Sequence, residues 1–442
     1  MQTILSLLIF VALTYWVGQI YFGKKKLRLV EVGKKEYYLL SPNMYFVIFT
    51  VCTAPIFLGS LSLLKYGLWF VVLLALLFAG RVRMKFEAMT AMYGIFFLWL
   101  CYTMTYTTVP RDGAMMLIKF LLPMLFLWLG YSAIRNENDL IIFLKVVNVV
   151  ACVYCFTMGG FAAKFISPLY IFMAGVFSTY AAFADFLTAV FIVPIMLYWL
   201  TKEKKYIFCA LWMVLSTVLQ AVRTGMGGMM LVFVIALLLK DKVKSLPGLA
   251  VAGAMFLGVV LFVPSVNEKF FGEDAGKVSA TDIVQGGALR IDKVEMSGRE
   301  YTWERVKENC FYGNEVLGSG LGSSGRFMKD YGNAHNSVVM MHNDYLQIIC
   351  DTGLVGITLL TIFYVILILK VASNVALWRS SLLVKLTGIM AFPSLAGIAF
   401  CMYFDNVVSN SMQSMVIPYI YLGFFLKALD LEKRNGVAVI KS

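Results

Sequence analysis

The feature that most constrains this chain is the recurrence, from one end to the other, of apolar runs of about 20 residues, the length an α-helix needs to cross the hydrocarbon core of a membrane. Hydrophobic residues make up 60% of the 442 positions and charged residues 14%. Soluble globular domains average about 45–50% and about 25%. We therefore expect an all-α integral membrane protein with about 12–13 transmembrane helices.

The first apolar segment carries neither a positive n-region nor a small-residue cleavage site, so we expect a retained span rather than a signal peptide. Hydropathy places the remaining spans with soft boundaries. The expected spans are 2–22, 43–63, 66–80, 88–108, 113–134, 140–161, 176–200, 205–222, 226–239, 247–264, 354–371, 383–404 and 411–427.

The net charge of +13 is explained by where the basic residues lie. They cluster in short connections between expected spans, as basic residues of cytoplasmic loops do. This distribution indicates membrane lipids, not nucleic acid, as the partner. This bias puts the N-terminus outside and the C-terminal tail in the cytoplasm. The clustered residues are Lys24, Lys25, Lys26, Arg28, Lys34, Lys35, Arg81, Arg83, Lys85, Lys202, Lys204, Lys205, Lys240, Lys242 and Lys244.

The same topology divides the chain into three parts. Residues 1–264 form an N-terminal bundle of about 10 spans, residues 265–353 form one large external loop, and residues 354–442 form the C-terminal helices and tail. The loop is turn-rich at first, by its density of Gly, Ser and Asp.

From SGREYTWERVKENC the large loop has a helical pattern. Ser297 is a candidate N-cap with Glu300 three residues later, as in a capping box. Trp303, Val306 and Cys310 then recur at helical spacing. We predict an amphipathic helix here.

The chain has only two histidines, His335 and His342, and both lie near the end of this loop. Histidine has the unperturbed pKa closest to neutrality, which favours a role in proton transfer. If residues 335–350 are helical, the two histidines share a face. The following segment is expected to break at Asp351-Thr-Gly353. The alternative is that either histidine only hydrogen-bonds the loop to the helices.

Three arginines accompany the histidines outside the expected membrane core. Arg223, in QAVRTGMGGMM, runs against the charge bias in a very short connection, and its guanidinium suits phosphate oxygens. Arg299 heads the expected loop helix, with Arg305 nearby. The alternatives are snorkelling or pairing with a loop carboxylate for Arg223, and solvated surface charge for the other two.

Two further patterns are interpreted as structural. GSGLGSSG contains a GxGxxG spacing, but it does not open a βαβ unit, so we expect a flexible loop and not a dinucleotide site. Asp185, inside an expected span, is either part of a proton path or structural. No cluster has metal-ligand spacing and no cofactor is indicated, so we expect neither a metal nor a cofactor.

Three segments, taken in order, resemble the O-antigen ligase/polymerase family of bacterial envelope glycosyltransferases. They are Arg223-Thr-Gly225, SGREYTWERVKENCFYGNEVLGSGLGS, and HNDYLQIICDTGLVG. In the third, His342-Asn343 is followed by nine residues and then Gly353-x-x-Gly356. The direct match covers roughly residues 205–375.

The resemblance implies a GT-C-like fold in the bacterial inner membrane with a periplasmic loop. It also implies a donor glycan on undecaprenyl diphosphate and an acceptor hydroxyl on lipid A core or on another lipid-linked glycan. His342 then takes the base role, Arg223 and Arg299 bind the diphosphate, and His335, Asn343, Arg305, Gly353 and Gly356 are possible supporting residues. Such an enzyme is expected to work without a metal.

Other functions remain open at this stage. A polymerase of lipid-linked repeats presents the same residues as a ligase, although the His-Asn-x9-Gly-x-x-Gly spacing favours a ligase. A polysaccharide-lipid transporter or flippase usually shows internal repeats around a midplane site. A non-catalytic assembly protein predicts that substitutions at all three main site residues are silent.

Overall fold

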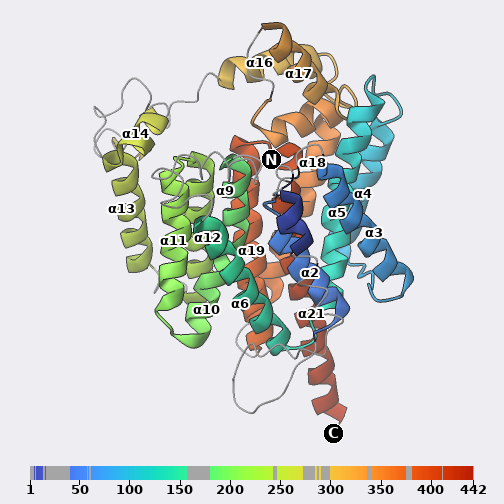
Figure 1. Cartoon of the computed structure of the whole chain (residues 1–442). Coiled ribbons are helices and arrows are strands. Elements are labelled where there is room, and N and C mark those ends of the chain that lie inside the picture. The colour runs from blue at the N-terminus through green and yellow to red at the C-terminus, as the bar shows by residue number, and fades with distance from the viewer. Residues whose placement is uncertain are drawn as a thin grey trace.

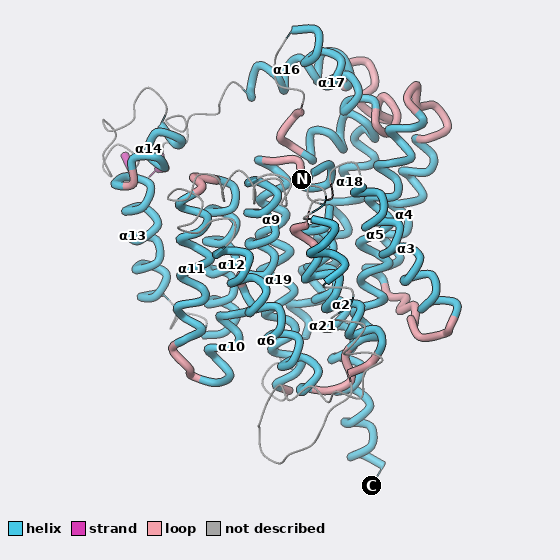
Figure 2. The backbone as a smooth tube through the Cα atoms, viewed as in Figure 1, coloured by secondary structure: helices cyan, strands magenta, loops and turns pink. Residues whose placement is uncertain are grey.

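In a computed structural model the part of the chain that is described is almost entirely helical (Figures 1 and 2). The structure describes residues 4, 6–12, 15, 40–56, 58, 61–156, 180–241, 246–271, 284–285, 288–289, 299–335, 340–374, 381–410 and 412–441. The expected first span, its basic cluster at 24–35 and the proposed cap Ser297 lie largely or wholly outside these residues.

The long helices lie where the sequence has its apolar runs. Two short strands pair antiparallel, with Val284 opposite Leu289. The elements are α2 (Pro42–Thr53), α3 (Ser62–Phe78), α4 (Ala88–Thr103), α5 (Pro110–Ala133), α6 (Glu137–Tyr154), α9 (Tyr180–Val190), α10 (Ile192–Thr201), α11 (Lys205–Leu219), α12 (Arg223–Asp241), α13 (Leu246–Phe262), α14 (Pro264–Phe271), β1 (Val284–Gln285), β2 (Ala288–Leu289), α16 (Arg299–Cys310), α17 (Ser323–His335), α18 (Asp344–Asn374), α19 (Leu382–Phe404), α20 (Val407–Asn410) and α21 (Met412–Lys441).

Within the described residues, six helices are long and apolar enough to cross a membrane. The bent pair Pro247–Phe262 and Pro264–Phe271 adds a seventh if it counts as one span, and four shorter apolar helices accompany them. The expected all-α integral membrane fold is confirmed. The full number of spans stays a prediction, because several expected spans extend beyond the described residues.

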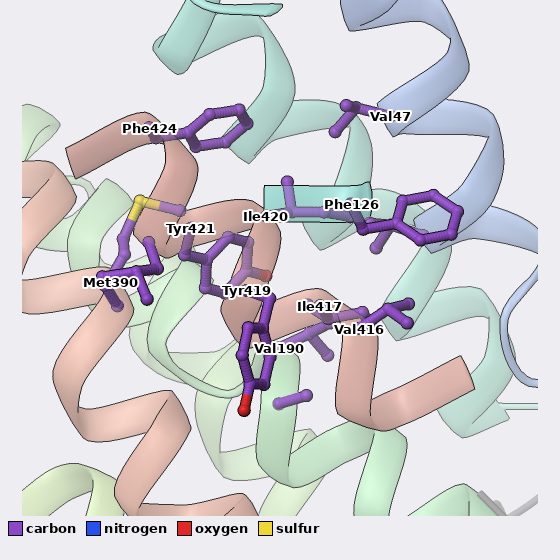
Figure 3. Packing of buried hydrophobic residues seen from close by; sticks show 14 of the residues in the cluster. Val47, Phe126, Val190, Met390, Val416, Ile417, Tyr419, Ile420, Tyr421 and Phe424 are labelled. Atoms are coloured by element: carbon purple, nitrogen blue, oxygen red, sulfur yellow. The ribbon is translucent and has the colours of Figure 1, made fainter. Parts of the chain in front are cut away.

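The core of the bundle forms where α21 packs against α5 and α19. Figure 3 shows Tyr419, Tyr421 and Phe424 of α21 within this core, together with Phe126 of α5. The backbones of α5 and α21 approach closely at Gly130 and Gly423, where a Cβ would run into the main chain of the other helix. Small residues are what allow membrane helices to pack at such short range.

The large loop and the C-terminus lie at opposite ends of the bundle. Figure 1 shows α16 and α17 at the top and the end of α21 at the bottom. The bottom end also holds the start of α2, where the Asn43 side chain donates to the carbonyls of Arg81 and Ser132. The basic α3–α4 connection is therefore fixed at the end away from α16.

Helix α18 breaks where the sequence indicated. Gly353 has φ 68° and ψ −171°, a conformation that is essentially restricted to glycine. The break leaves backbone N–H and C=O groups of α18 without helical partners, and the segment around Val316 bonds to them. Leu354 N donates to Glu315 O at 2.7 Å, and Ser319 N donates to Cys350 O at 2.9 Å. The expected break is confirmed, and it is stabilised by the loop.

Two expectations for the loop are wrong. Residues 335–350 do not form one helix, because α17 ends at His335 and α18 begins at Asp344, so the two histidines do not share a helical face. GSGLGSSG is not a flexible loop either. Asp351 accepts hydrogen bonds from the main-chain N–H groups of Gly322 and Ser324 at 2.8 Å each, and a Cβ on Gly320 would lie 2.6 Å from Thr107.

The break at Gly353 gives a stability prediction. We expect Gly353→Ala to lower the free energy of unfolding by about 2 kcal/mol or more, because any Cβ there meets the Val316 main chain in a backbone conformation that alanine disfavours. Gly258→Ala is the matched control, since a Cβ at Gly258 in α13 has nothing within 4 Å. Thermal unfolding in detergent measures both. Equal unfolding temperatures would contradict the prediction.

Candidate active site

His342 pairs with a carboxylate from another helix. Its Nδ1 lies 3.1 Å from Oδ1 of Asp405, and the His342 side chain stays 29% exposed while that of Asp405 is 8% exposed. A carboxylate can only accept a hydrogen bond, so Nδ1 carries the proton and the Nε2 lone pair remains available. In this tautomer Nε2 can take a proton from a bound hydroxyl.

Backbone geometry on both sides holds this pair. His342 has φ 52°, an unusual conformation for a residue other than glycine, and it lies two residues before α18. Asp405 is the C-cap of α19 in an extended conformation, and its Oδ1 also accepts the Asn406 N–H at 2.8 Å. The turn after α19 thus aims the carboxylate at the imidazole.

Arg299 joins the pair from the loop. It is the first residue of α16, and its Nη1 donates to the main-chain oxygen of Phe404, the residue before Asp405. Burial lowers the pKa of the Arg299 guanidinium, and the negative charge of Asp405 opposes that shift. The structure thus brings His342, Asp405 and Arg299 together.

Arg223 lies at the same end of the bundle as Asp405. It opens α12, whose first turns pack on the last turns of α19: the Cys401 thiol contacts the Thr224 carbonyl at 3.7 Å, and a Cβ on Gly227 would lie 2.6 Å from the Phe400 ring. The Arg223 guanidinium also lies 5.9 Å from the centre of the Phe270 ring. No described contact joins Arg223 directly to His342.

Asn343 has a structural contact of its own. Its side-chain oxygen accepts the Leu346 N–H at 2.9 Å, and its main-chain oxygen accepts the Gln347 N–H, so Asn343 caps α18. The next residue, Asp344, accepts the Val408 N–H at 3.0 Å. The residues directly after His342 thus fix α18 against α20.

The other predicted site residues lie apart from the pair. Arg305 is on the exposed face of α16, in an ion pair of 2.9 Å with Glu308 and over the Tyr301 ring. His335 is the last residue of α17, and its side chain lies outside the described residues.

Gly353 and Gly356 belong to the helix break. By helical rise Gly353 lies about 13 Å and Gly356 about 18 Å along α18 from its first residue, Asp344, so their place in the motif is structural. Gly356 packs near Trp99 of α4, whose indole N–H donates to Thr352 O at 2.9 Å.

Asp405 is the site residue that the sequence analysis missed. It directly follows the expected span 383–404 and lies 63 residues from its partner His342, so no local spacing links the two. The only sequence feature that points to Asp405 is its position, a carboxylate at the external end of an apolar run. Asp185, by comparison, is buried in α9 beside the Cys401 thiol.

Comparison with known proteins supports the family resemblance that the three sequence motifs indicated. Residues 208–361 match the family model described as O-antigen ligase. This range contains Arg223, Arg299 and His342 but not Asp405, which lies beyond its end at residue 361. A search of curated proteins finds no match.

Proposed function

The chain belongs to the O-antigen ligase/polymerase family, and from that premise we propose that it is a membrane glycosyltransferase of the ligase type. It would move a glycan from undecaprenyl diphosphate to a sugar hydroxyl of lipid A core at the periplasmic face. The observation that carries this proposal is the His342–Asp405 pair with Arg299 beside it. The reaction needs a base for the acceptor and positive charge for the departing diphosphate.

The pair supplies the base. With Asp405 holding Nδ1, the Nε2 atom of His342 accepts the proton of the acceptor hydroxyl as its oxygen attacks the anomeric carbon. General-base catalysis of this kind typically contributes about 10²–10⁴-fold in rate. Asp405 also stabilises the imidazolium that forms.

The arginines supply the positive charge. Arg299 already donates one N–H to Phe404 O, and its remaining N–H groups are available for a diphosphate oxygen in our proposal. Arg223 would approach from α12 at the same end of the bundle. Fixed guanidinium groups can stabilise a leaving diphosphate without a metal ion, and metal independence is part of the proposal.

The charge distribution supports a periplasmic site in a bacterial inner membrane. The α3–α4 connection with Arg81, Arg83 and Lys85 lies at the end of the bundle away from α16. Short basic connections favour the cytoplasmic side. The end that carries His342 would then face outward, where finished lipid-linked glycans are presented.

Deletion of the gene, followed by gel analysis of lipopolysaccharide, tests the ligase assignment. We expect bare core together with accumulated lipid-linked polymer, and complementation should restore the polymer ladder. Core bearing a single repeat would instead indicate a polymerase. Normal lipopolysaccharide, combined with substrate-dependent flux through the purified protein in vesicles, would replace the proposal with a transporter.

Substitution of the arginines tests diphosphate binding. We expect Arg299→Ala and Arg223→Ala each to lower transfer by about 10–100-fold, with Lys a poor replacement because an ammonium lacks the guanidinium fork. Arg326→Ala is the matched control, since Arg326 is an exposed arginine of α17 paired with Asp330 at 2.8 Å. Transfer measured with a lipid-diphosphate donor reports the effect. Wild-type turnover in both alanine variants would remove these arginines from the site.

A further inference from the structure

Helix α16 bonds to the residue before each member of the His342–Asp405 pair, through two side chains one helical turn apart. Arg299 donates to the carbonyl of Phe404, the residue before Asp405. Trp303, four residues later, donates its indole N–H to the carbonyl of Met341 at 2.7 Å, and Met341 is the residue before His342. One face of α16 therefore links two chain segments that are distant in sequence.

The same face of α16 is the one that packs onto the bundle. Val306 and Cys310 are buried in a small cluster with Met341 and Leu346, and Trp303 packs against this cluster. The Trp303 ring also lies edge-on to Tyr403 at 6.0 Å. The helix is thus seated on the start of α18 and on the end of α19.

The Trp303 contact bears on the unusual backbone conformation of His342. His342 adopts φ 52°, which needs support from its surroundings. The Met341 carbonyl and the His342 nitrogen belong to one planar peptide unit. A hydrogen bond to that oxygen therefore fixes the orientation of the peptide plane, and with it the direction of the His342 side chain. Trp303 supplies a directional bond at this point.

We propose that Trp303 is a positioning residue for glycosyl transfer, acting by holding the Met341 carbonyl so that His342 meets Asp405. This inference rests on the proposed function of the pair. Trp303 itself touches neither His342 nor Asp405 in any described contact. Its effect is therefore expected on the chemical step and not on substrate binding.

Trp303→Phe tests the proposal because it keeps an aromatic ring and removes the N–H. We expect kcat for transfer to fall about tenfold with KM for the lipid-linked donor unchanged, since the lost bond positions the base. The matched control is Trp128→Phe. Trp128 is also partly buried and donates its indole N–H to a carbonyl, that of Lys85 at 3.2 Å, at the other end of the bundle. The control should keep wild-type kcat, and an unchanged kcat in Trp303→Phe would overturn the proposal.

A second measurement separates positioning from general weakening of the fold. In an Asp405→Asn background, where the pair is already impaired, Trp303→Phe should lower kcat by less than about twofold. The full tenfold loss in that background would overturn the proposal, because it would show that Trp303 acts independently of the pair. His342→Ala separates failure of the positioning role of Trp303 from failure of the proposed function. If it is inactive while Trp303→Phe is normal, only the positioning role fails; if it is active, the proposed function fails as well.

Discussion

His342→Ala is expected to abolish glycan transfer while the protein stays folded and inserted in the membrane. The imidazole is the group placed to take the acceptor proton, and its removal costs the whole general-base contribution, about 10²–10⁴-fold. The side chain is 29% exposed and Asp405 keeps a second hydrogen bond, from the Asn406 N–H, so the protein should stay folded. Surface polysaccharide in a complemented deletion strain, with membrane protein quantified alongside, measures the effect.

Lys307→Ala is a suitable control for that experiment. Lys307 is a polar residue of the same loop, exposed on α16 and paired with Glu304 at 3.1 Å, and surface pairs of this kind contribute little. It should give wild-type polysaccharide. Near-normal polysaccharide in the His342→Ala strain would refute the catalytic assignment.

Asp405→Asn is expected to have the second largest effect, a fall in kcat of about 10²-fold or more with KM for the donor little changed. The asparagine side chain fits the same space, but it removes the negative charge that stabilises the imidazolium and can turn an amide N–H toward Nδ1. The ring then loses the partner that sets its tautomer. Steady-state transfer kinetics on purified protein measure the split between kcat and KM.

Asp430→Asn offers a matched control for Asp405→Asn. Asp430 on α21 is partly buried and, like Asp405, bonded to a basic side chain, that of Lys85 at 2.8 Å, but it lies at the opposite end of the bundle. The control should lower the unfolding temperature without changing kcat. If Asp405→Asn behaved in the same way, Asp405 would have only a structural role.

The sequence alone predicted the membrane fold because hydropathy is a property of each segment by itself. Helices α12, α19 and α21 begin within a few residues of the expected spans, and the break at Gly353 was expected from its position between a polar segment and a long apolar run. The helical pattern of Trp303, Val306 and Cys310 was also confirmed by their packing in one cluster.

Contacts between distant segments were not predictable in this way. The pairing of Asp405 with His342 depends on how α19 ends beside the start of α18, which no spacing in one sequence reveals. The continuous helix considered for residues 335–350 failed because Asn343 caps α18 and His342 takes a positive φ. The composition of the glycine-rich segment predicts a flexible loop, yet Asp351 holds this segment by three hydrogen bonds.

The most direct test of the account is transfer by the purified protein in vitro. Wild-type protein in lipid vesicles, supplied with a glycan on undecaprenyl diphosphate and with lipid A core, should form the glycan–core product and release undecaprenyl diphosphate, in the presence of a chelator as well as without it. His342→Ala protein of equal stability should form none. Equal product formation by the two proteins would contradict the central claim that the His342–Asp405 pair carries the reaction.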